Sequence, residues 1–380
     1  IGRYEAYLAQ EDSAEVHNYA AQAYWQLGNL PAALRHLQAA LRLDARNVAL
    51  AQRLATIANW LNDLDAAQQA LDGALRLQPT EPALHFLAGQ VAYKRCDLPR
   101  AIAALQHSVE LTPTNTLYLG SLGGYLLAQG DVEAMQPYLA QLRSAPPADY
   151  AAHWLAAALL LEGAQVSAAG APTATTAAAT ADIATEQARA EYSLALAAPD
   201  LPAGAAAAMH TALGSLAYWE NDMAAARREF SATLALAPDY VDAEIGLGDL
   251  ALLAGDPTAA EQHYRRAQEN LPAYAANYSY DSAAVYGPLL PMRLALAARQ
   301  RGDVAGEQAA RQAAETALAA LQATAPDWAS VSAAAGMLAL VRGDAESAAS
   351  AFARSVACDR TLVEAQEQIE KLVAAGSTGE

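Results

Sequence analysis

Seven histidines are the residues of this sequence best suited to acid–base or metal chemistry. Four of them fall at one position of the repeating unit described below: His17, His85, His153 and His210. A metal ion needs ligands that converge on one point, whereas equivalent positions of successive units are spread along the chain. We therefore predict a packing role for these four side chains and no metal site. His36 and His263 share another position, which we expect to be exposed.

Other chemical motifs are missing from the sequence. It contains no glycine-rich phosphate loop, nucleophile elbow or zinc-binding histidine–glutamate helix, and its two cysteines form no metal-ligand pattern. Gly120, Gly123 and Gly124 cluster inside a predicted helix, where glycine allows close packing or a local kink. The sequence therefore predicts no catalytic residue and no cofactor, and it favours a protein that is not an enzyme.

The elements that position these residues follow a regular period. Turn signals recur every 34 residues in the first part of the chain and again further on. Glycine and asparagine accept the left-handed conformation that ends a helix, and aspartate caps the next helix. We therefore expect helical hairpins around Gly28-Asn29, Asn62-Asp63, Cys96-Asp97, Gly130-Asp131, Asn221-Asp222, Gly255-Asp256, Gly302-Asp303 and Gly343-Asp344.

Residues at fixed distances from each turn are periodic as well. Small residues let the two helices of a hairpin approach, a large residue fills the gap between hairpins, and proline ends the second helix. The small residue stands seven positions before the turn, as in Ala21, Ala55, Gly89, Gly123, Gly214, Gly248, Ala295 and Gly336. The large one stands nine positions after it, as in Leu37, Leu71, Leu105, Leu139, Phe230, Tyr264 and Phe352. The prolines are Pro79, Pro113, Pro147, Pro238 and Pro272.

This pattern resembles the tetratricopeptide repeat (TPR) family, whose unit is a helix–turn–helix of about 34 residues. The resemblance covers most of residues 14–360. It implies an all-α fold, a right-handed superhelical solenoid of about eight to nine repeats with a C-terminal capping helix. Only two lysines occur against 21 arginines, which is typical of a GC-rich genome, and we expect a bacterial protein.

The period also predicts how the chain is organised. Residues 165–181 are rich in alanine and threonine and could form a flexible loop or a poorly packed helix. Their low complexity favours a surface loop, followed by a second helix near 182–198. The half repeat at the start suggests that the native protein begins inside the array or extends upstream. The predicted segments are a partial preceding repeat or N-terminal helix (1–13), repeats one to four (14–149), an irregular repeat with the Ala/Thr-rich insertion (150–206), repeats six and seven (207–274), looser repeats eight and nine after a Tyr-rich insertion (275–360), and a capping helix with a tail (361–380).

The charge of the chain excludes some partners. Its net charge is −18, with about −4 in residues 1–149 and −14 in 150–380. Such an acidic surface repels phosphates, which argues against nucleic acids and anionic membranes. No apolar stretch is long enough to insert into a membrane. The compartment stays open between the cytoplasm and an exported, periplasmic location.

The family resemblance implies which side chains could meet a partner. In this family the first helices of the units line a concave groove. The corresponding positions here are Asn18, Gln22, Trp25, Thr56, Asn59, Trp60, Phe86, Gln90, Tyr93, Lys94, Trp154, Tyr218 and Trp219. Aromatic side chains beside amides are typical of binding hot spots. The lysine-rich carboxylate clamp of the family's chaperone co-factors is not matched, because Lys94 is the lone cation among these residues.

These observations favour a non-enzymatic scaffold that binds a peptide or protein segment in its groove. Two alternatives stay open. The chain could be a structural subunit that assembles, with itself or in a larger complex, through repeat edges and convex faces. It could also be a repeat module of a larger secretion or polysaccharide-export protein. A polysaccharide ligand is less favoured than a protein, although aromatic and amide side chains also suit sugar rings.

Overall fold

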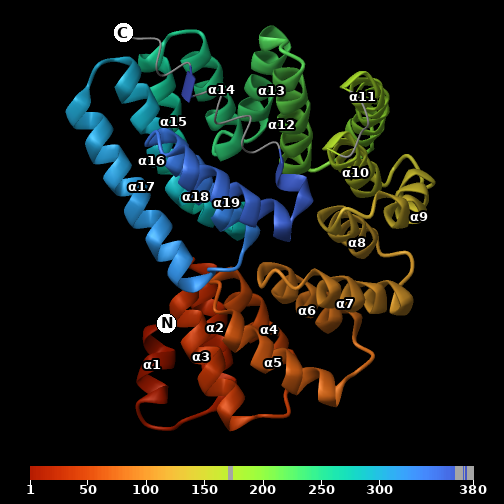
Figure 1. The fold of residues 1–380 in the computed structure, drawn as a ribbon. Coiled ribbons are helices and arrows are strands. Elements are labelled where there is room, and N and C mark those ends of the chain that lie inside the picture. The colour runs from red at the N-terminus through yellow and green to blue at the C-terminus, as the bar shows by residue number, and fades with distance from the viewer. Residues whose placement is uncertain (170–173, 364–370, 372, 375–380) are drawn as a thin grey trace. The chain divides into compact units, whose positions relative to one another are not determined.

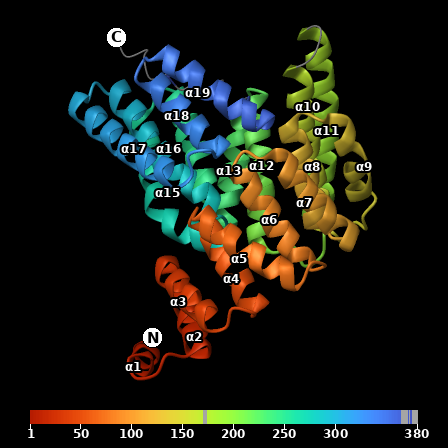
Figure 2. The same cartoon turned by 60° about the horizontal axis from the view of Figure 1, so that its bottom comes forward.

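The computed structural model describes residues 1–169, 174–363, 371, 373 and 374, and these residues form helices and no strand. The chain divides into two compact units, Ile1–Tyr118 and Leu119–Glu380. In each unit, successive helices pair side by side, as α6 with α7 and α18 with α19 (Figures 1 and 2). The all-α prediction of helical hairpins is confirmed.

The first unit contains a short leading helix and three hairpins: α1 (Gly2–Leu8), α2 (Ala14–Gln26) with α3 (Leu30–Leu43), α4 (Val48–Trp60) with α5 (Leu64–Leu77), and α6 (Pro82–Lys94) with α7 (Leu98–Leu111). The next helix, α8 (Thr116–Gln129), begins at the end of this unit. The remaining helices belong to the second unit: α9 (Val132–Arg143), α10 (Tyr150–Ala169), α11 (Ala174–Leu196), α12 (Ala203–Trp219), α13 (Met223–Leu236), α14 (Val241–Leu253), α15 (Pro257–Asn277), α16 (Tyr280–Gln300), α17 (Val304–Thr324), α18 (Ala329–Val341), α19 (Ala345–Cys358) and the 3-10 turn η1 (Arg360–Val363). We call the even-numbered helices from α2 onward first helices and their odd-numbered partners second helices.

The predicted turns have the predicted backbone. All eight turn residues have positive φ, including Asn62 at 58° and Cys96 at 59°, where a glycine would be the usual choice. The residue after each turn accepts a hydrogen bond from the backbone amide three positions on, as Asp63 Oδ1 does from Ala66 at 3.1 Å. Each second helix therefore starts at a fixed point after the left-handed residue.

Small and large residues meet where the sequence predicted close packing. A Cβ added to Gly89 would lie 2.1 Å from Leu105 Cδ1, and one added to Gly248 would lie 2.4 Å from Tyr264 Cε1. Phe230 is in contact both with Gly214 of its own hairpin and with Gly246 of the next one. The large side chain therefore fills the space between adjacent hairpins.

The Ala/Thr-rich segment is not the surface loop that we expected. Residues 165–169 extend α10 and residues 174–181 begin α11, while 170–173 lie outside the described residues. Alanine has the highest helix propensity of all residues, so the insertion lengthens both helices of this hairpin. The later part of α11 keeps the predicted register, because Ala188, Tyr192 and Ala195 are buried.

The prediction that Pro272 ends the second helix is wrong. The helix α15 continues through it to Asn277, although proline leaves the carbonyl four residues earlier without its helical hydrogen bond. Packing offsets this cost: Tyr274 is buried, and its ring lies 5.5 Å from that of Tyr240 and 5.3 Å from that of Tyr278. The Tyr-rich segment is thus largely helical.

The helix α17 combines two kinds of contact. It has 21 residues, whereas the second helix α3 of the first hairpin has 14. Near its start, Glu307 accepts hydrogen bonds from Arg299 at 2.7 and 3.0 Å and pairs with Arg311 at 3.7 Å. Further along, apolar packing resumes through the buried Ala314, Leu318 and Leu321. The predicted capping helix and tail, 361–380, fall largely on residues that the structure does not describe. The described residues 360–363 form the 3-10 turn η1.

Replacement by alanine should have opposite effects on stability at two glycines inside helices of the first unit, Gly73 and Gly89. Gly73→Ala should stabilise the protein by about 0.5–1 kcal/mol, because alanine is the better helix former and the new Cβ has only Arg76 within 4 Å, at 3.9 Å. Gly89→Ala should destabilise it by about 1–3 kcal/mol, because the Cβ overlaps Leu105. Urea unfolding of both variants beside the wild type measures the difference. Equal stabilities for the two variants would contradict the close-packing account.

Candidate binding surfaces

An aromatic pair connects the first two hairpins of the first unit. Trp25 of α2 and Trp60 of α4 meet edge to face, with 5.5 Å between their ring centroids. Trp25 keeps 38% of its surface exposed, and Trp60 is half-buried. Exposed tryptophan is uncommon and supplies a large apolar area with few rotatable bonds. The structure therefore brings together two of the predicted groove residues as a partly open aromatic surface.

Polar side chains beside this pair connect the same first helices. Arg53 Nη1 donates to Asn18 Oδ1 at 2.8 Å, which ties α4 to α2. The exposed Gln22 lies one turn from Trp25 on α2. Thr56 is committed locally, because its hydroxyl donates to the Gln52 carbonyl at 2.9 Å. Around Trp25 the surface thus offers amide groups, of which Gln22 is solvent-accessible.

Other predicted groove residues are buried in the packing of first helices. Lys94 is only 2% exposed, and its Nζ donates to Asn59 O at 2.8 Å and Asn62 Oδ1 at 3.1 Å. Asn59 is likewise 2% exposed, and its Nδ2 donates weakly to Gln90 Oε1 at 3.4 Å. The interpretation of Lys94 as a cation that faces a partner is therefore wrong, because the ammonium group is spent inside the protein. Tyr93 on the same helix is half-buried.

A second aromatic contact lies on α6, the first helix of the third hairpin. Phe86 of α6 lies 5.0 Å from Tyr118, measured between ring centroids. Phe86 is half-buried and Tyr118 is 8% exposed. This pair packs one helix onto the next, so it contributes more to the stack than to an open surface.

Three predicted groove residues fall in the second unit. Tyr218 and Trp219 end α12, and their rings meet edge to face at 5.7 Å. Tyr218 is 6% exposed, whereas Trp219 is half-buried with Lys371 Nζ 4.9 Å from its ring centroid. Trp154 of α10 is half-buried, and no contact between its ring and the α12 pair is present among the described residues. The structure thus groups Tyr218 with Trp219 and leaves Trp154 apart.

A cavity of about 230 Å³ lies beside Tyr218 and Trp219. Side chains from four first helices, α12, α14, α16 and α18, and from Phe230 of α13 form its wall. The polar lining residues are Thr211, Ser215, Tyr218, Asp242, Asp249 and Arg293. The apolar lining includes Trp219, Ile245, Leu289 and Met337.

Buried charges surround this cavity. Asp249 accepts hydrogen bonds from Arg293 Nε at 2.9 Å and from Tyr264 Oη at 2.8 Å. Burial alone lowers the pKa of Arg293, but the charge and hydrogen bonds of Asp249 raise it overall, so the guanidinium stays charged. Asp242 accepts hydrogen bonds from Tyr274 and Tyr286. Burial raises the pKa of Asp242, and the two tyrosine hydroxyls oppose the rise.

Sequence reasoning found one wall of the cavity and missed the other. Tyr218 and Trp219 of α12 are predicted groove residues. The residues of α16, above all Arg293, lie after the Tyr-rich segment, where the 34-residue spacing is lost. The usable signal was an arginine within the apolar run 288–298, since buried arginine requires a carboxylate partner.

Several histidines connect the two helices of a hairpin. His17 and His36 lie 2.8 Å apart through their Nδ1 atoms, and the same two positions hold His210 with Glu229 at 2.8 Å. His36 is half-buried rather than exposed, as is His263, which pairs with Glu244 at 2.6 Å. Within the described residues no cluster of three or more histidine, cysteine or acidic side chains could hold a metal ion. Nor is any described helix both long and apolar enough to cross a membrane.

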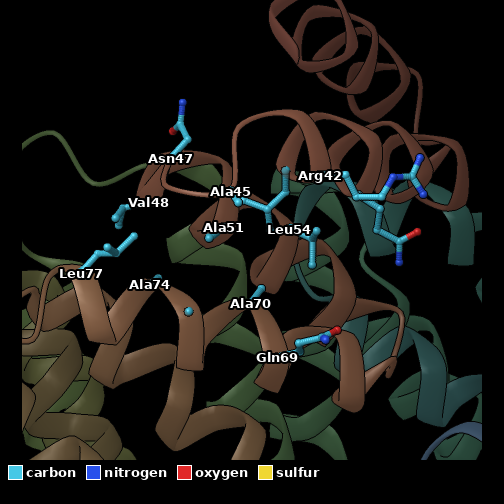
Figure 3. Close-up of a pocket in the computed structure, with 13 residues that line it drawn as sticks. Arg42, Ala45, Asn47, Val48, Ala51, Leu54, Gln69, Ala70, Ala74 and Leu77 are labelled. Atoms are coloured by element: carbon cyan, nitrogen blue, oxygen red, sulfur yellow. The ribbon is translucent and has the colours of Figure 1, made fainter. Parts of the chain in front are cut away.

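A second hollow, of about 430 Å³, lies between neighbouring second helices of the first unit. Figure 3 shows Arg42, Ala51, Leu54 and Gln69 around it. The walls come from α3, α4 and α5, and small residues such as Ala70 and Gly73 keep the space open. Its lining combines apolar residues such as Leu54 and Leu77 with the polar side chains of Gln38, Arg42, Asn47 and Gln69.

Comparison with known proteins points to one family. A family model described as a tetratricopeptide repeat matches residues 1–48, 60–116 and 211–275. These segments include the aromatic pair and much of the cavity. No protein of curated function matches the chain.

One solved structure shares the fold. A tetratricopeptide repeat protein from Parabacteroides merdae covers 73% of this chain and 98% of its own, at 12% identity and a TM-score of 0.50. At this identity the likeness extends to the fold alone. Two further structures match less well. A human IFIT1 dimer with m7Gppp-AAAA covers 90% of this chain and 71% of its own, at 15% identity and a TM-score of 0.49. Yeast Tom70 covers 98% and 90%, at 14% identity and a TM-score of 0.37.

A half-buried carboxyl elsewhere in the second unit predicts a pH effect on stability. Burial, helped by the charge of Asp359, raises the pKa of Glu162 from 4.5 to about 7. The folded state therefore binds more protons than the unfolded state between these two values, and stability falls as pH rises through this window. Glu162→Gln should raise the free energy of unfolding by up to about 3 kcal/mol at pH 8 and change it little at pH 4.5.

Urea unfolding of wild type and Glu162→Gln at the two pH values measures this effect. Other titrating groups are common to both proteins, so the difference between them isolates Glu162. A difference that is the same at both pH values would refute the assignment.

Proposed function

Because this chain is a tetratricopeptide repeat protein, we propose that it is a non-enzymatic scaffold that binds a protein or peptide segment on its first helices. The repeat fold itself is a protein–protein interaction scaffold. The observation that supports a particular surface is the partly exposed Trp25 packed on Trp60. Aromatic side chains at the centre of an interface often carry most of the binding energy.

The side chains near this pair define the partner's chemistry. The exposed Gln22 and the amide of Asn18 offer hydrogen bonds without net charge. Lys94 is buried and hydrogen-bonded, so its ammonium group is not available to a terminal carboxylate, and the exposed Arg53 already donates to Asn18. An uncharged segment with an apolar or aromatic side chain suits the surface best, whether it binds extended or as a helix.

Substitution of the tryptophans tests this surface. Trp25→Ala and Trp60→Ala should each weaken partner binding by about 30-fold or more, the loss typical of a hot spot of about 2 kcal/mol. Helicity by circular dichroism should change little. The measurement is an affinity pull-down from the native organism, with captured proteins quantified by mass spectrometry.

Leu43→Ala is the matched control. Leu43 is an apolar residue of the same hairpin, 48% exposed, but it lies at the end of the second helix α3. It should retain the partner that both tryptophan variants lose. Equal recovery with all variants would refute the proposed surface, and capture of a polysaccharide in place of a protein would refute the partner class.

The hollow between second helices favours a second candidate function, a structural role in which copies of the chain associate through their second-helix faces. The hollow has a volume of about 430 Å³, and among its lining residues Leu77 is 40% exposed. Apolar surface of this kind gains free energy when a partner covers it.

Filling the hollow tests this candidate. Gly73→Leu places a side chain into open space, so the fold should persist while the recess is blocked. Sedimentation velocity over a range of concentrations should show wild-type self-association that the variant loses. A wild type that remains monomeric at all concentrations would rule the candidate out.

A further inference from the structure

We propose that the cavity beside Tyr218 and Trp219 binds a neutral carboxamide, the side-chain amide of an asparagine or glutamine in a partner segment. The inference deepens the proposed scaffold function, because it names the chemistry that a second site on the first helices would take. It concerns the second unit alone, whereas the tryptophan surface lies in the first unit.

Two hydrogen-bond donors of this cavity have no partner in the protein. Tyr218 Oη and Arg293 Nη1 are buried and make no hydrogen bond. The two residues are 6% and 5% exposed, and both line the cavity. Burying a polar group without a partner is costly, so such groups call for an explanation, and a ligand acceptor supplies one. The acceptor must reach both donors at once.

The donors are held in place before any ligand arrives. Arg293 is held by Asp249, whose two oxygens accept hydrogen bonds from Nε at 2.9 Å and from Nη2 at 3.3 Å. The remaining nitrogen, Nη1, makes no hydrogen bond. Tyr264 Oη also donates to Asp249, at 2.8 Å, on the same oxygen that accepts from Arg293 Nε. The Tyr218 ring is held edge-on against Trp219. A ligand therefore meets rigid groups, which reduces the entropic cost of binding.

The charges around the cavity select a neutral ligand. Arg293 pairs with Asp249, and Asp242 is a further acidic residue of the lining. An anion would add negative charge to a buried lining that already holds two acidic residues, which is unfavourable. A cation would meet the unbonded N–H of Arg293. A carboxamide avoids both penalties: its carbonyl accepts from Tyr218 Oη and Arg293 Nη1, and its NH₂ can donate to Asp249 Oδ2.

The size and wall of the cavity agree with one side chain. Its volume of about 230 Å³ is below the roughly 300 Å³ at which pockets for drug-sized ligands begin. Ile245, Leu289 and Met337 supply apolar walls against which the methylene groups of glutamine can pack. An extended sugar chain or a nucleotide exceeds this space.

Small capped amino acids test the proposal without knowledge of the partner. N-acetyl-glutamine amide is titrated into the full chain, with N-acetyl-glutamate amide and glucose as comparison probes. The readout is the NMR signal of ¹³C-methyl-labelled methionines. Met337 lines the cavity, while the other four, Met135, Met209, Met223 and Met292, do not line it and serve as internal controls. We expect the glutamine probe to shift Met337 alone, with a dissociation constant on the order of millimolar.

A pair of tyrosine variants separates binding from folding. Tyr218→Phe removes a hydroxyl without a partner, so it should leave the Tm unchanged or raised and weaken the glutamine probe by about fivefold. Tyr278→Phe removes a hydroxyl bonded to Asp239 and does not line the cavity, so it should lower the Tm by about 2–4 °C and keep probe binding within about twofold.

Several outcomes would overturn the proposal. These are equal binding of the glutamate probe, binding of glucose in its place, no shift of Met337 up to saturating probe (a cavity that holds water only), or full binding by Tyr218→Phe. The test is independent of the scaffold surface. A Met337 response together with normal partner capture by the tryptophan variants would uphold the carboxamide site and reject the proposed scaffold surface.

Discussion

The close approach of two helices at a small residue is the contact on which the rest of this structure depends. Where Gly89 meets Leu105, or Gly214 and Gly246 enclose Phe230, backbone and side chain are separated by little more than van der Waals contact. That contact fixes the spacing within a hairpin and the offset to the next one. The side chains of successive first helices are therefore brought together in a set order, and both candidate binding surfaces follow from it.

The two units use their first helices in different ways. In the first unit the polar groups are spent between helices, as Lys94 is on Asn59 and Asn62, and aromatic area is left at the surface. In the second unit the aromatic rings are more buried, and charged groups such as Asp249 and Arg293 enclose a small cavity. One repeating backbone thus offers an apolar surface in one place and a polar recess in another.

The sequence predicts the local features well because each is decided by one or two residues. Asn62 and Cys96 take the left-handed conformation at predicted turns, and Gly120 and Gly123 lie against Leu155 and Leu159 as close packing requires. Prediction is weaker where several residues decide together. Pro272 is overridden by three packed tyrosines, and Arg293 joins the site only through a helix whose register the period had lost. The burial of Lys94 was also missed. The sequence places it at a predicted groove position, but contacts with a neighbouring hairpin bury its side chain.

The histidine pairs show that some repeat positions depend on each other rather than on one preferred residue type. The positions that hold His210 and Glu229 in one hairpin hold Glu244 and His263 in the next, and two histidines in the first. The contact is kept while the residue at each position changes, so what is specified is complementarity between two sites 19 residues apart. A description of the repeat by one position at a time sees only variation there. At these positions the repeat specifies a pair of complementary side chains, and the two members of a pair can exchange places without loss of the contact.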